Sequence, residues 1–194
     1  MKKIIFSLIL FNFFINSALS LEADVFVQST VNRASMVLSE DIPKEKKIEK
    51  LKKIARDTVN IKGIGDYTLG SVRKNLSEEK QLKYSELFEK YFLKSFSSRL
   101  AEYTNPEIDV FGKEILSKNY TIVNSTLKAT SERPEIKIDW RIFTKNPEKP
   151  LIMDLIIEGL SLARTQKEEF ASVLNSNDGD INALFKILEE FINN

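Results

Sequence analysis

The spacing of hydrophobic and polar residues changes twice along this chain and divides it into three parts. From about residue 24 to 104, apolar residues recur every three or four positions, which is the period of an amphipathic helix. From about 107 to 158 they alternate with polar residues, as in strands with one buried face. Helical spacing returns from about 160 to 193. This order predicts an α+β fold, and the length of 21–194 suits a single domain.

The longest predicted helix runs from about Glu78 to Tyr103. Ser77 supplies a side-chain cap at its start, and Pro106 disfavours a helical conformation in the residue before it. A short helix over Ile64–Lys74 is expected to precede it. The long helix carries an aromatic-rich stripe, which most often marks a helix face that packs into a core. The stripe comprises Leu82, Phe88, Tyr91, Phe92, Phe96, Leu100 and Tyr103.

Four strands are predicted in the middle of the chain. The clearest is Ile136–Ile142, where apolar and charged residues alternate strictly. Tyr120–Ala129 is a second strand, Glu107–Phe111 is a shorter one before it, and Leu151–Ile157 follows after a proline-containing turn. Short turns between successive strands favour antiparallel pairing. We therefore expect a four-stranded antiparallel sheet that packs against helices.

The residue types that this chain lacks exclude several kinds of chemistry. It contains no cysteine and no histidine. Thiol and imidazole nucleophiles, zinc sites built on those groups, and every triad that needs a histidine are therefore ruled out. Catalysis, if present, would rest on carboxylates, lysines, tyrosines or serines, and no metal site is predicted.

The first twenty residues have the layout of a secretory signal peptide, predicted over 1–20. Lys2 and Lys3 precede an apolar run, and small residues suit cleavage after Ser20. The run is shorter than the ~20 residues that a membrane-spanning helix needs. Cleavage removes two of the 29 basic residues and none of the 28 acidic ones, so the net charge becomes −1. This balance favours neither nucleic acid nor an anionic membrane surface as a partner.

The segment DLIIEGLSL, residues 154–162, carries two carboxylates beside a glycine. On a strand, Asp154 and Glu158 would share one face about 13 Å apart, at ~3.3 Å per residue. That separation exceeds the ~5 to 9.5 Å that paired-carboxylate glycosidases use. A small enzyme with a carboxylate base, of the ketosteroid isomerase type, is one alternative. In the simpler interpretation, Glu158 receives backbone N–H groups or pairs with a cation, and Gly159 provides the turn into the next helix.

Several motifs follow one another in a fixed order. They are DYTLGSVR at 66–73 with LSEE at 76–79, the aromatic helix over 88–103, IKIDWRI at 136–142, and DLIIEGLSL at 154–162. In this order they resemble the periplasmic phospholipid-binding MlaC proteins, also called the toluene-tolerance family, over roughly residues 30 to 190. The chain departs from the family pattern at Leu151-Ile152-Met153, where the family has Trp and Tyr. It departs again at Ala163-Arg164-Thr165, where the family has Asn-Tyr-Arg.

The resemblance implies a curved sheet of the nuclear-transport-factor-2 kind that meets a helical subdomain and encloses an apolar pocket. It implies a monomeric periplasmic carrier, not an enzyme, with phospholipid as cargo and no cofactor. Such a carrier shuttles lipid between an outer-membrane lipoprotein complex and an inner-membrane ABC transporter, which maintains outer-membrane lipid asymmetry. A non-lipid envelope adaptor on the same fold is a further alternative. A filled core would favour the adaptor, whereas a large continuous cavity would favour the lipid carrier.

The apolar faces of the helices and the sheet supply the candidates for a lipid pocket. They are Leu69, Val72, Phe88, Phe92, Phe96, Val123, Leu127, Ile136, Ile138, Trp140, Met153, Leu155, Ile157, Leu160 and Phe170. Arginine suits phosphate because its planar group donates two parallel hydrogen bonds, so Arg73, Arg141 and Arg164 are candidates for a headgroup contact. Composition alone does not separate a lined pocket from a filled core.

Overall fold

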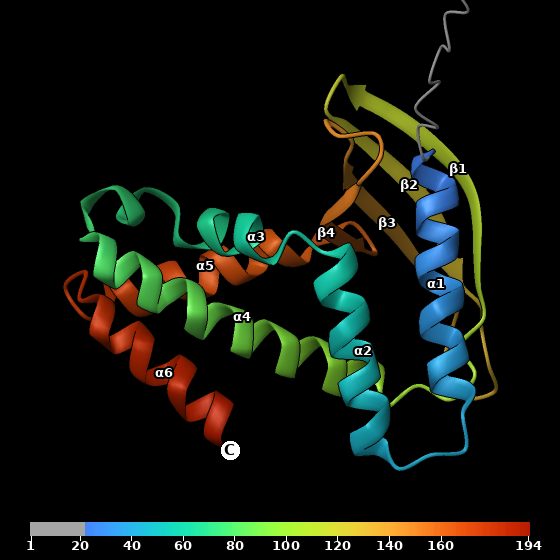
Figure 1. The fold of residues 1–194 in the computed structure, drawn as a ribbon, viewed down its shortest axis with the longest axis horizontal. Helices are drawn as coiled ribbons and strands as arrows, with labels where there is room; N and C mark the ends of the chain where they lie inside the picture. The colour runs from blue at the N-terminus through green and yellow to red at the C-terminus, as the bar shows by residue number, and fades with distance from the viewer. Residues whose placement is uncertain (1–21) are drawn as a thin grey trace, which may run out of the picture.

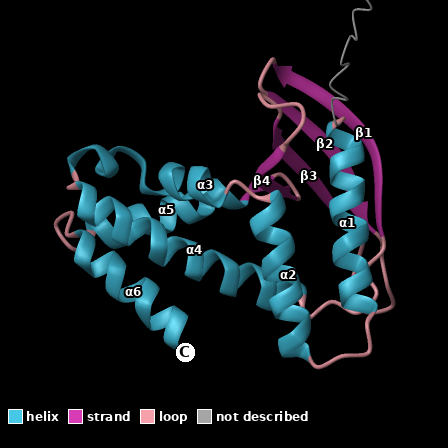
Figure 2. Ribbon diagram, viewed as in Figure 1, coloured by secondary structure: helices cyan, strands magenta, loops and turns pink. Residues whose placement is uncertain are grey.

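The computed structural model describes residues 22–194, so the predicted signal peptide lies outside the described residues. Helices pack against an antiparallel sheet and extend to one side of it (Figures 1 and 2). The helical elements are α1 (Ala23–Ser39), α2 (Lys44–Thr58), α3 (Ile61–Leu69), the 3-10 helix η1 (Gly70–Asn75), α4 (Glu78–Leu100), α5 (Leu162–Asn175) and α6 (Ile181–Asn193). The strands are β1 (Ile108–Ser117), β2 (Tyr120–Leu127), β3 (Ile136–Phe143), β4 (Leu151–Ile157) and β5 (Leu160–Ser161).

The strands pair in chain order from β1 to β5, and every pairing is antiparallel. The sheet is curved, and α1 lies against β1 and β2 (Figure 1). The helices α3, α4, α5 and α6 gather into a subdomain beside β4, and α3 and α5 both contact that strand. A curved antiparallel sheet that meets a helical subdomain confirms the predicted fold class.

The sheet has a fifth strand where four were predicted. Glu158 and Gly159 both have positive φ, 49° and 82°, which is the backbone of a tight hairpin turn. The chain therefore reverses and pairs once more, through Ile157 and Leu160, before α5 begins. The expected turn at Gly159 is present, but it leads into β5 and reaches the helix only after that short strand.

The first strand is longer than its sequence pattern indicated. It continues to Ser117, whereas the prediction ended at Phe111. Residues 113–118 are exposed, so no alternation of apolar and polar residues marks this half of the strand. Backbone pairing with β2 defines it instead, with a register shift between Val110 and Gly112.

The predicted helix boundaries are close to the observed ones. Ser77 caps α4, because its hydroxyl accepts a hydrogen bond from the Lys80 backbone N–H at 3.3 Å. The helix ends at Leu100, three residues before the predicted end. The predicted helix over Ile64–Lys74 is divided into α3 and η1, because Gly70 takes a φ of 61° and ends the α-helix there.

One apolar core joins the sheet to the helices. On β3 the burial alternates strictly, which confirms the predicted half-buried strand. Trp140 lies on its buried face, and its indole N–H donates to the Ser125 hydroxyl at 2.8 Å, so this polar group is satisfied. From the helical side, the rings of Phe88 and Phe170 meet edge to face at 6.3 Å.

Gly65 in α3 permits close contact with Phe88 of α4. A Cβ atom at Gly65 would lie 2.8 Å from Cδ1 of that ring, and Phe88 is only 2% exposed. We expect Gly65→Ala to lower the free energy of unfolding by about 1 kcal/mol in urea denaturation, because overpacking outweighs the better helix propensity of alanine. Adding Phe88→Leu should make the combined loss smaller than the sum of the two single losses. An unchanged stability in Gly65→Ala would contradict this account.

Candidate functional site

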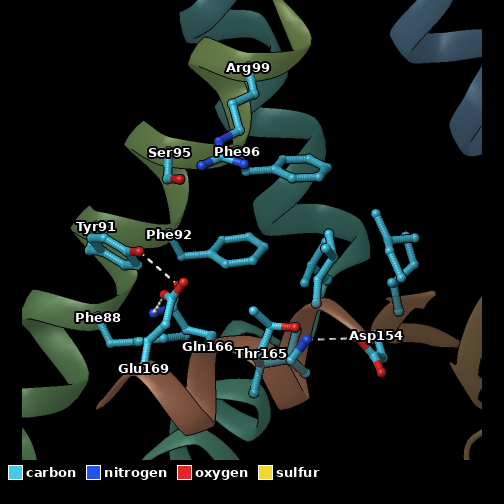
Figure 3. Close-up of a pocket in the computed structure, with 16 residues that line it drawn as sticks. Phe88, Tyr91, Phe92, Ser95, Phe96, Arg99, Asp154, Thr165, Gln166 and Glu169 are labelled. Atoms are coloured by element: carbon cyan, nitrogen blue, oxygen red, sulfur yellow. Dashed lines mark hydrogen bonds between the residues drawn. The ribbon is translucent and has the colours of Figure 1, made fainter. Parts of the chain in front are cut away.

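A cavity of about 210 Å³ lies where α4 and α5 approach β4 (Figure 3). The two helices supply most of its lining residues, and β4, the end of α2 and α3 supply the others. Its lining residues are Val59, Ile64, Phe88, Tyr91, Phe92, Ser95, Phe96, Arg99, Ile152, Asp154, Leu155, Leu162, Ala163, Thr165, Gln166 and Glu169.

The wall from α4 is aromatic. Phe88, Phe92 and Phe96 follow one another at four-residue intervals, so they lie on one face of the helix. The rings of Phe88 and Phe92 are 6.2 Å apart, and those of Phe92 and Phe96 are 5.5 Å apart and only 12° from parallel. This series gives the cavity a continuous surface without hydrogen-bonding groups, which suits an apolar ligand.

A short chain of hydrogen bonds links α4 to α5 at the cavity. The Tyr91 hydroxyl donates to the Gln166 side-chain oxygen at 2.7 Å, and the Gln166 amide donates to the Glu169 carboxylate at 2.9 Å (Figure 3). Burial raises the pKa of Tyr91 above its ordinary value, and the negative charge of Glu169 acts in the same direction. Tyr91 therefore remains a protonated donor at neutral pH.

A second cavity of about 360 Å³ adjoins the first. Ile64, Asp154 and Ala163 line both cavities, so one wall separates the two. The other lining residues of the second cavity are Tyr67, Leu116, Ser117, Tyr120, Arg141 and Met153. This cavity therefore lies at the end of the β1–β2 hairpin and receives one guanidinium group.

Asp154 is buried in the shared wall, with its side chain 2% exposed. Its carboxylate accepts hydrogen bonds from the Ser161 hydroxyl at 2.5 Å and from the Ala163 backbone N–H at 3.0 Å. It also lies 3.7 Å from the Arg141 guanidinium on the neighbouring strand. These contacts fasten the first turn of α5 to the sheet, so the carboxylate acts as a structural support.

Glu158 lies apart from that carboxylate and its contacts. It is exposed in the β4–β5 turn, and its side chain accepts the backbone N–H of Lys137, which confirms the simpler interpretation of this acid. It lines neither cavity. The two carboxylates therefore do not converge on one place, as a general acid and base would. Across residues 22–194, no group of acidic side chains could hold a metal ion.

The predicted lipid-binding residues divide between the cavities, the core and the surface. The first cavity is lined by Phe88, Phe92, Phe96 and Leu155, and the second by Met153. The buried core holds Leu69, Val123, Leu127, Ile138, Trp140 and Phe170, with Val72 and Ile136 packed against it. Ile157 is half-buried, and Leu160 on β5 is 68% exposed.

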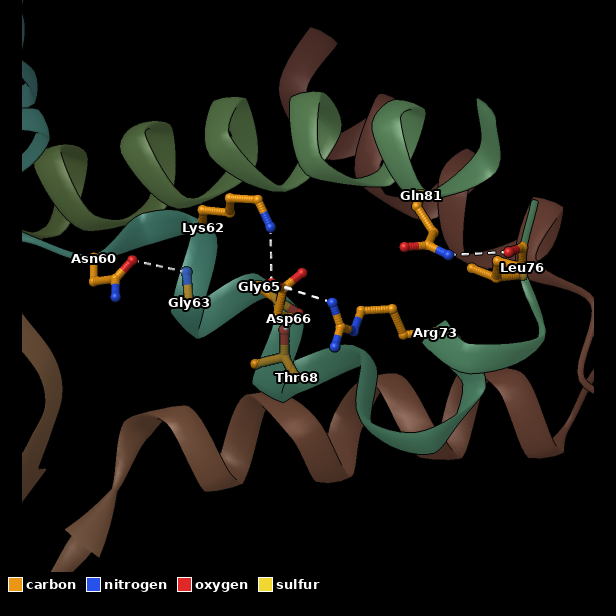
Figure 4. A network of polar contacts seen from close by, with 9 residues as sticks. All are labelled: Asn60, Lys62, Gly63, Gly65, Asp66, Thr68, Arg73, Leu76 and Gln81. Atoms are coloured by element: carbon orange, nitrogen blue, oxygen red, sulfur yellow. Dashed lines mark hydrogen bonds and ion pairs between the residues drawn. The ribbon is translucent and has the colours of Figure 1, made fainter. Parts of the chain in front are cut away.

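The three predicted headgroup arginines lie in different places. Arg141 lines the second cavity. Arg73 lies on η1, with its guanidinium 3.5 Å from Asp66, which also accepts a hydrogen bond from Lys62 at 2.8 Å (Figure 4). Arg164 is exposed on α5 and lines neither cavity. The structure therefore does not bring the three together.

Several polar residues of the first cavity are not among the sequence-based candidates. They include Arg99 on α4 and Gln166 and Glu169 on α5. Arg99 follows Phe96 by three residues, so helical spacing places it beside the aromatic stripe, and this was an available signal. The two α5 residues gave no comparable signal, because their role depends on which face of α5 meets α4.

Comparison with known proteins finds a family and a fold. A family model described as MlaC protein matches residues 28–190. The structure of a phospholipid-binding protein from Ralstonia solanacearum, in complex with a phospholipid, is similar with a TM-score of 0.75. It is 20% identical, and the match covers 88% of this chain and 97% of that chain, which shows a shared fold.

Two further results concern the curated proteins and the membrane. Comparison with curated proteins finds no match to this chain. Within the described part of the chain, no helix is long and apolar enough to cross a membrane. The family match spans most of the sequence, and the protein therefore belongs to the MlaC family.

Proposed function

We propose that this protein carries phospholipid and binds the acyl chains of the lipid in the cavity between α4 and α5. The observation that carries this proposal is the aromatic wall formed by Phe88, Phe92 and Phe96. Membership of the MlaC family and the phospholipid bound to the Ralstonia solanacearum protein support the same class of ligand. A lipid requires such a site because each methylene left in water costs about 0.8 kcal/mol.

The volume of the cavity sets a condition on binding. Pockets for small molecules usually enclose about 300 to 1,000 Å³, and the first cavity encloses about 210 Å³. We infer that cargo is held in a more open state, in which α4 and α5 are further apart. The hydrogen bond from Tyr91 to Gln166 joins these helices and would break on such opening, at a net cost of about 1 kcal/mol.

The wider role is proposed from the family and from the N-terminal sequence. A signal peptide over 1–20 would export the chain to the periplasm, and 21–194 would fold there as one domain. The carrier would exchange lipid with an outer-membrane lipoprotein complex and an inner-membrane ABC transporter of the Mla type. It would work as a monomer, without a cofactor and without catalysing a reaction. The energised transporter, and not the carrier, would set the direction of transport.

Native mass spectrometry tests the proposal directly. The mature protein would be purified without detergent from an exporting cell, and its bound lipid would be extracted and identified. We expect the folded protein to show an added mass that corresponds to bound phospholipid in a fixed ratio. Acyl chains in the apolar cavity should stay bound during purification, because their return to water is unfavourable. A folded protein that carries no lipid, and takes none from labelled vesicles, would overturn the carrier proposal.

A further inference from the structure

Arg99 projects a positive charge at the edge of the first cavity. It lies in the last turn of α4 and lines the cavity beside Ser95 and Phe96 (Figure 3). Within the described residues, its side chain makes no ion pair and no hydrogen bond. Four other arginines each pair with a carboxylate: Arg33, Arg56, Arg73 and Arg141. Arg99 is therefore an exposed cation beside an apolar site, and no carboxylate of the described residues neutralises it.

Ser95 adds a second donor on the same side of the helix. It precedes Arg99 by four residues, so the two side chains lie one above the other on one face of α4. Its hydroxyl makes no side-chain hydrogen bond within residues 22–194. A guanidinium next to a free hydroxyl suits a phosphate group, which accepts several hydrogen bonds at once.

The opposite wall carries a negative charge. Glu169 lies on α5 and lines the same cavity, and it forms no ion pair with Arg99 or with any other described residue. Its carboxylate accepts a hydrogen bond from the Gln166 amide, one turn earlier on the same helix, at 2.9 Å. This contact lies within α5 and does not depend on the distance to α4, so the carboxylate stays oriented when the cavity opens and retains acceptor capacity for a further donor.

We propose that this edge recognises a zwitterionic phospholipid headgroup, with the phosphate at Arg99 and Ser95 and a primary ammonium at Glu169. The inference rests on the proposed function, because it requires acyl chains in the cavity below. A headgroup with a phosphate and an ammonium complements one cation and one anion on facing helices. A phosphatidylglycerol headgroup ends in a neutral glycerol and has no ammonium, so it would leave Glu169 without a counter-charge.

The phosphate contact is tested by competition between phosphatidylethanolamine and diacylglycerol, which has the same chains and no phosphate. Vesicles that contain both lipids would load the delipidated protein, and native mass spectrometry would give the ratio of the two bound lipids. Arg99→Gln should lower the ratio of phosphatidylethanolamine to diacylglycerol about fivefold, as for a partly exposed ion pair. Arg99→Lys should retain part of the preference. The matched control is Arg56→Gln, whose arginine pairs with Glu89 and lines neither cavity, and its ratio should equal that of the wild type.

The ammonium contact is tested with vesicles of phosphatidylethanolamine and phosphatidylglycerol. Glu169→Gln should reduce the preference for phosphatidylethanolamine about fivefold, whereas Glu168→Gln, at an exposed position outside the cavity, should leave it unchanged. Circular dichroism would establish that each variant is folded. Ratios that stay at the wild-type value in Arg99→Gln and Glu169→Gln would overturn the headgroup inference while the carrier proposal stands. A wild-type protein that binds none of the three lipids would overturn both.

Discussion

Replacing Asp154 by alanine is expected to lower the free energy of unfolding by about 3 kcal/mol. The side chain is buried, and its carboxylate receives the Ser161 hydroxyl and the Ala163 backbone N–H. Without the carboxylate, the half-buried Ser161 hydroxyl and the buried Ala163 N–H lose their acceptor. Arg141 also loses its counter-charge. Because Arg141 is 40% exposed and water can replace that contact, we attribute most of the loss to the two hydrogen bonds.

Urea denaturation of three variants would test this assignment. Asp154→Asn keeps one oxygen acceptor in place, so it should lose less stability than Asp154→Ala. Glu158→Ala removes an exposed carboxylate from the β4–β5 turn, and it should cost less than about 1 kcal/mol. If Asp154→Ala were as stable as the wild type, the carboxylate would not be a support, and a chemical role for it would have to be considered again.

The sequence was informative wherever short-range rules determine the structure. Strict alternation located β3, since each second side chain of a strand points to the same face. Ser77 marked the start of α4 because a capping hydroxyl satisfies a backbone N–H within the same few residues. The family motifs added the arrangement of sheet and helices, which the spacing of apolar residues alone does not determine.

The site itself depends on contacts between distant segments, and few of these contacts could be predicted from the sequence. Arg141 reaches Asp154 because β3 and β4 pair in one particular register. Most apolar residues of the sheet proved to be core, since the helices cover the face to which they point. The prediction of cavity-lining residues was best on α4, because the aromatic stripe follows from the spacing within that one helix. It was worst on α5, because Gln166 and Glu169 line the cavity only as a result of the face that α5 turns toward α4.

A tryptophan at position 95 is expected to reduce lipid loading more than tenfold. Ser95 lines the first cavity from α4, between Phe92 and Phe96, so an indole at this position would extend from the proposed phosphate contact into the volume proposed for the acyl chains. Each methylene excluded from the cavity costs about 0.8 kcal/mol, and the exclusion of two already weakens binding by about one order of magnitude. The measurement is uptake of labelled phospholipid from vesicles by delipidated Ser95→Trp.

The matched control for that variant is Ser98→Trp, which places the same indole three residues further along α4 at a position that lines neither cavity. Ser98→Trp should load lipid as the wild type does. It controls for any effect of an added aromatic ring that does not depend on the cavity. Normal loading in both variants would exclude the first cavity as the acyl-chain site. The cavity beside Tyr120 and Met153 would then be the place to block next, and the headgroup inference at Arg99 would fail together with the first cavity.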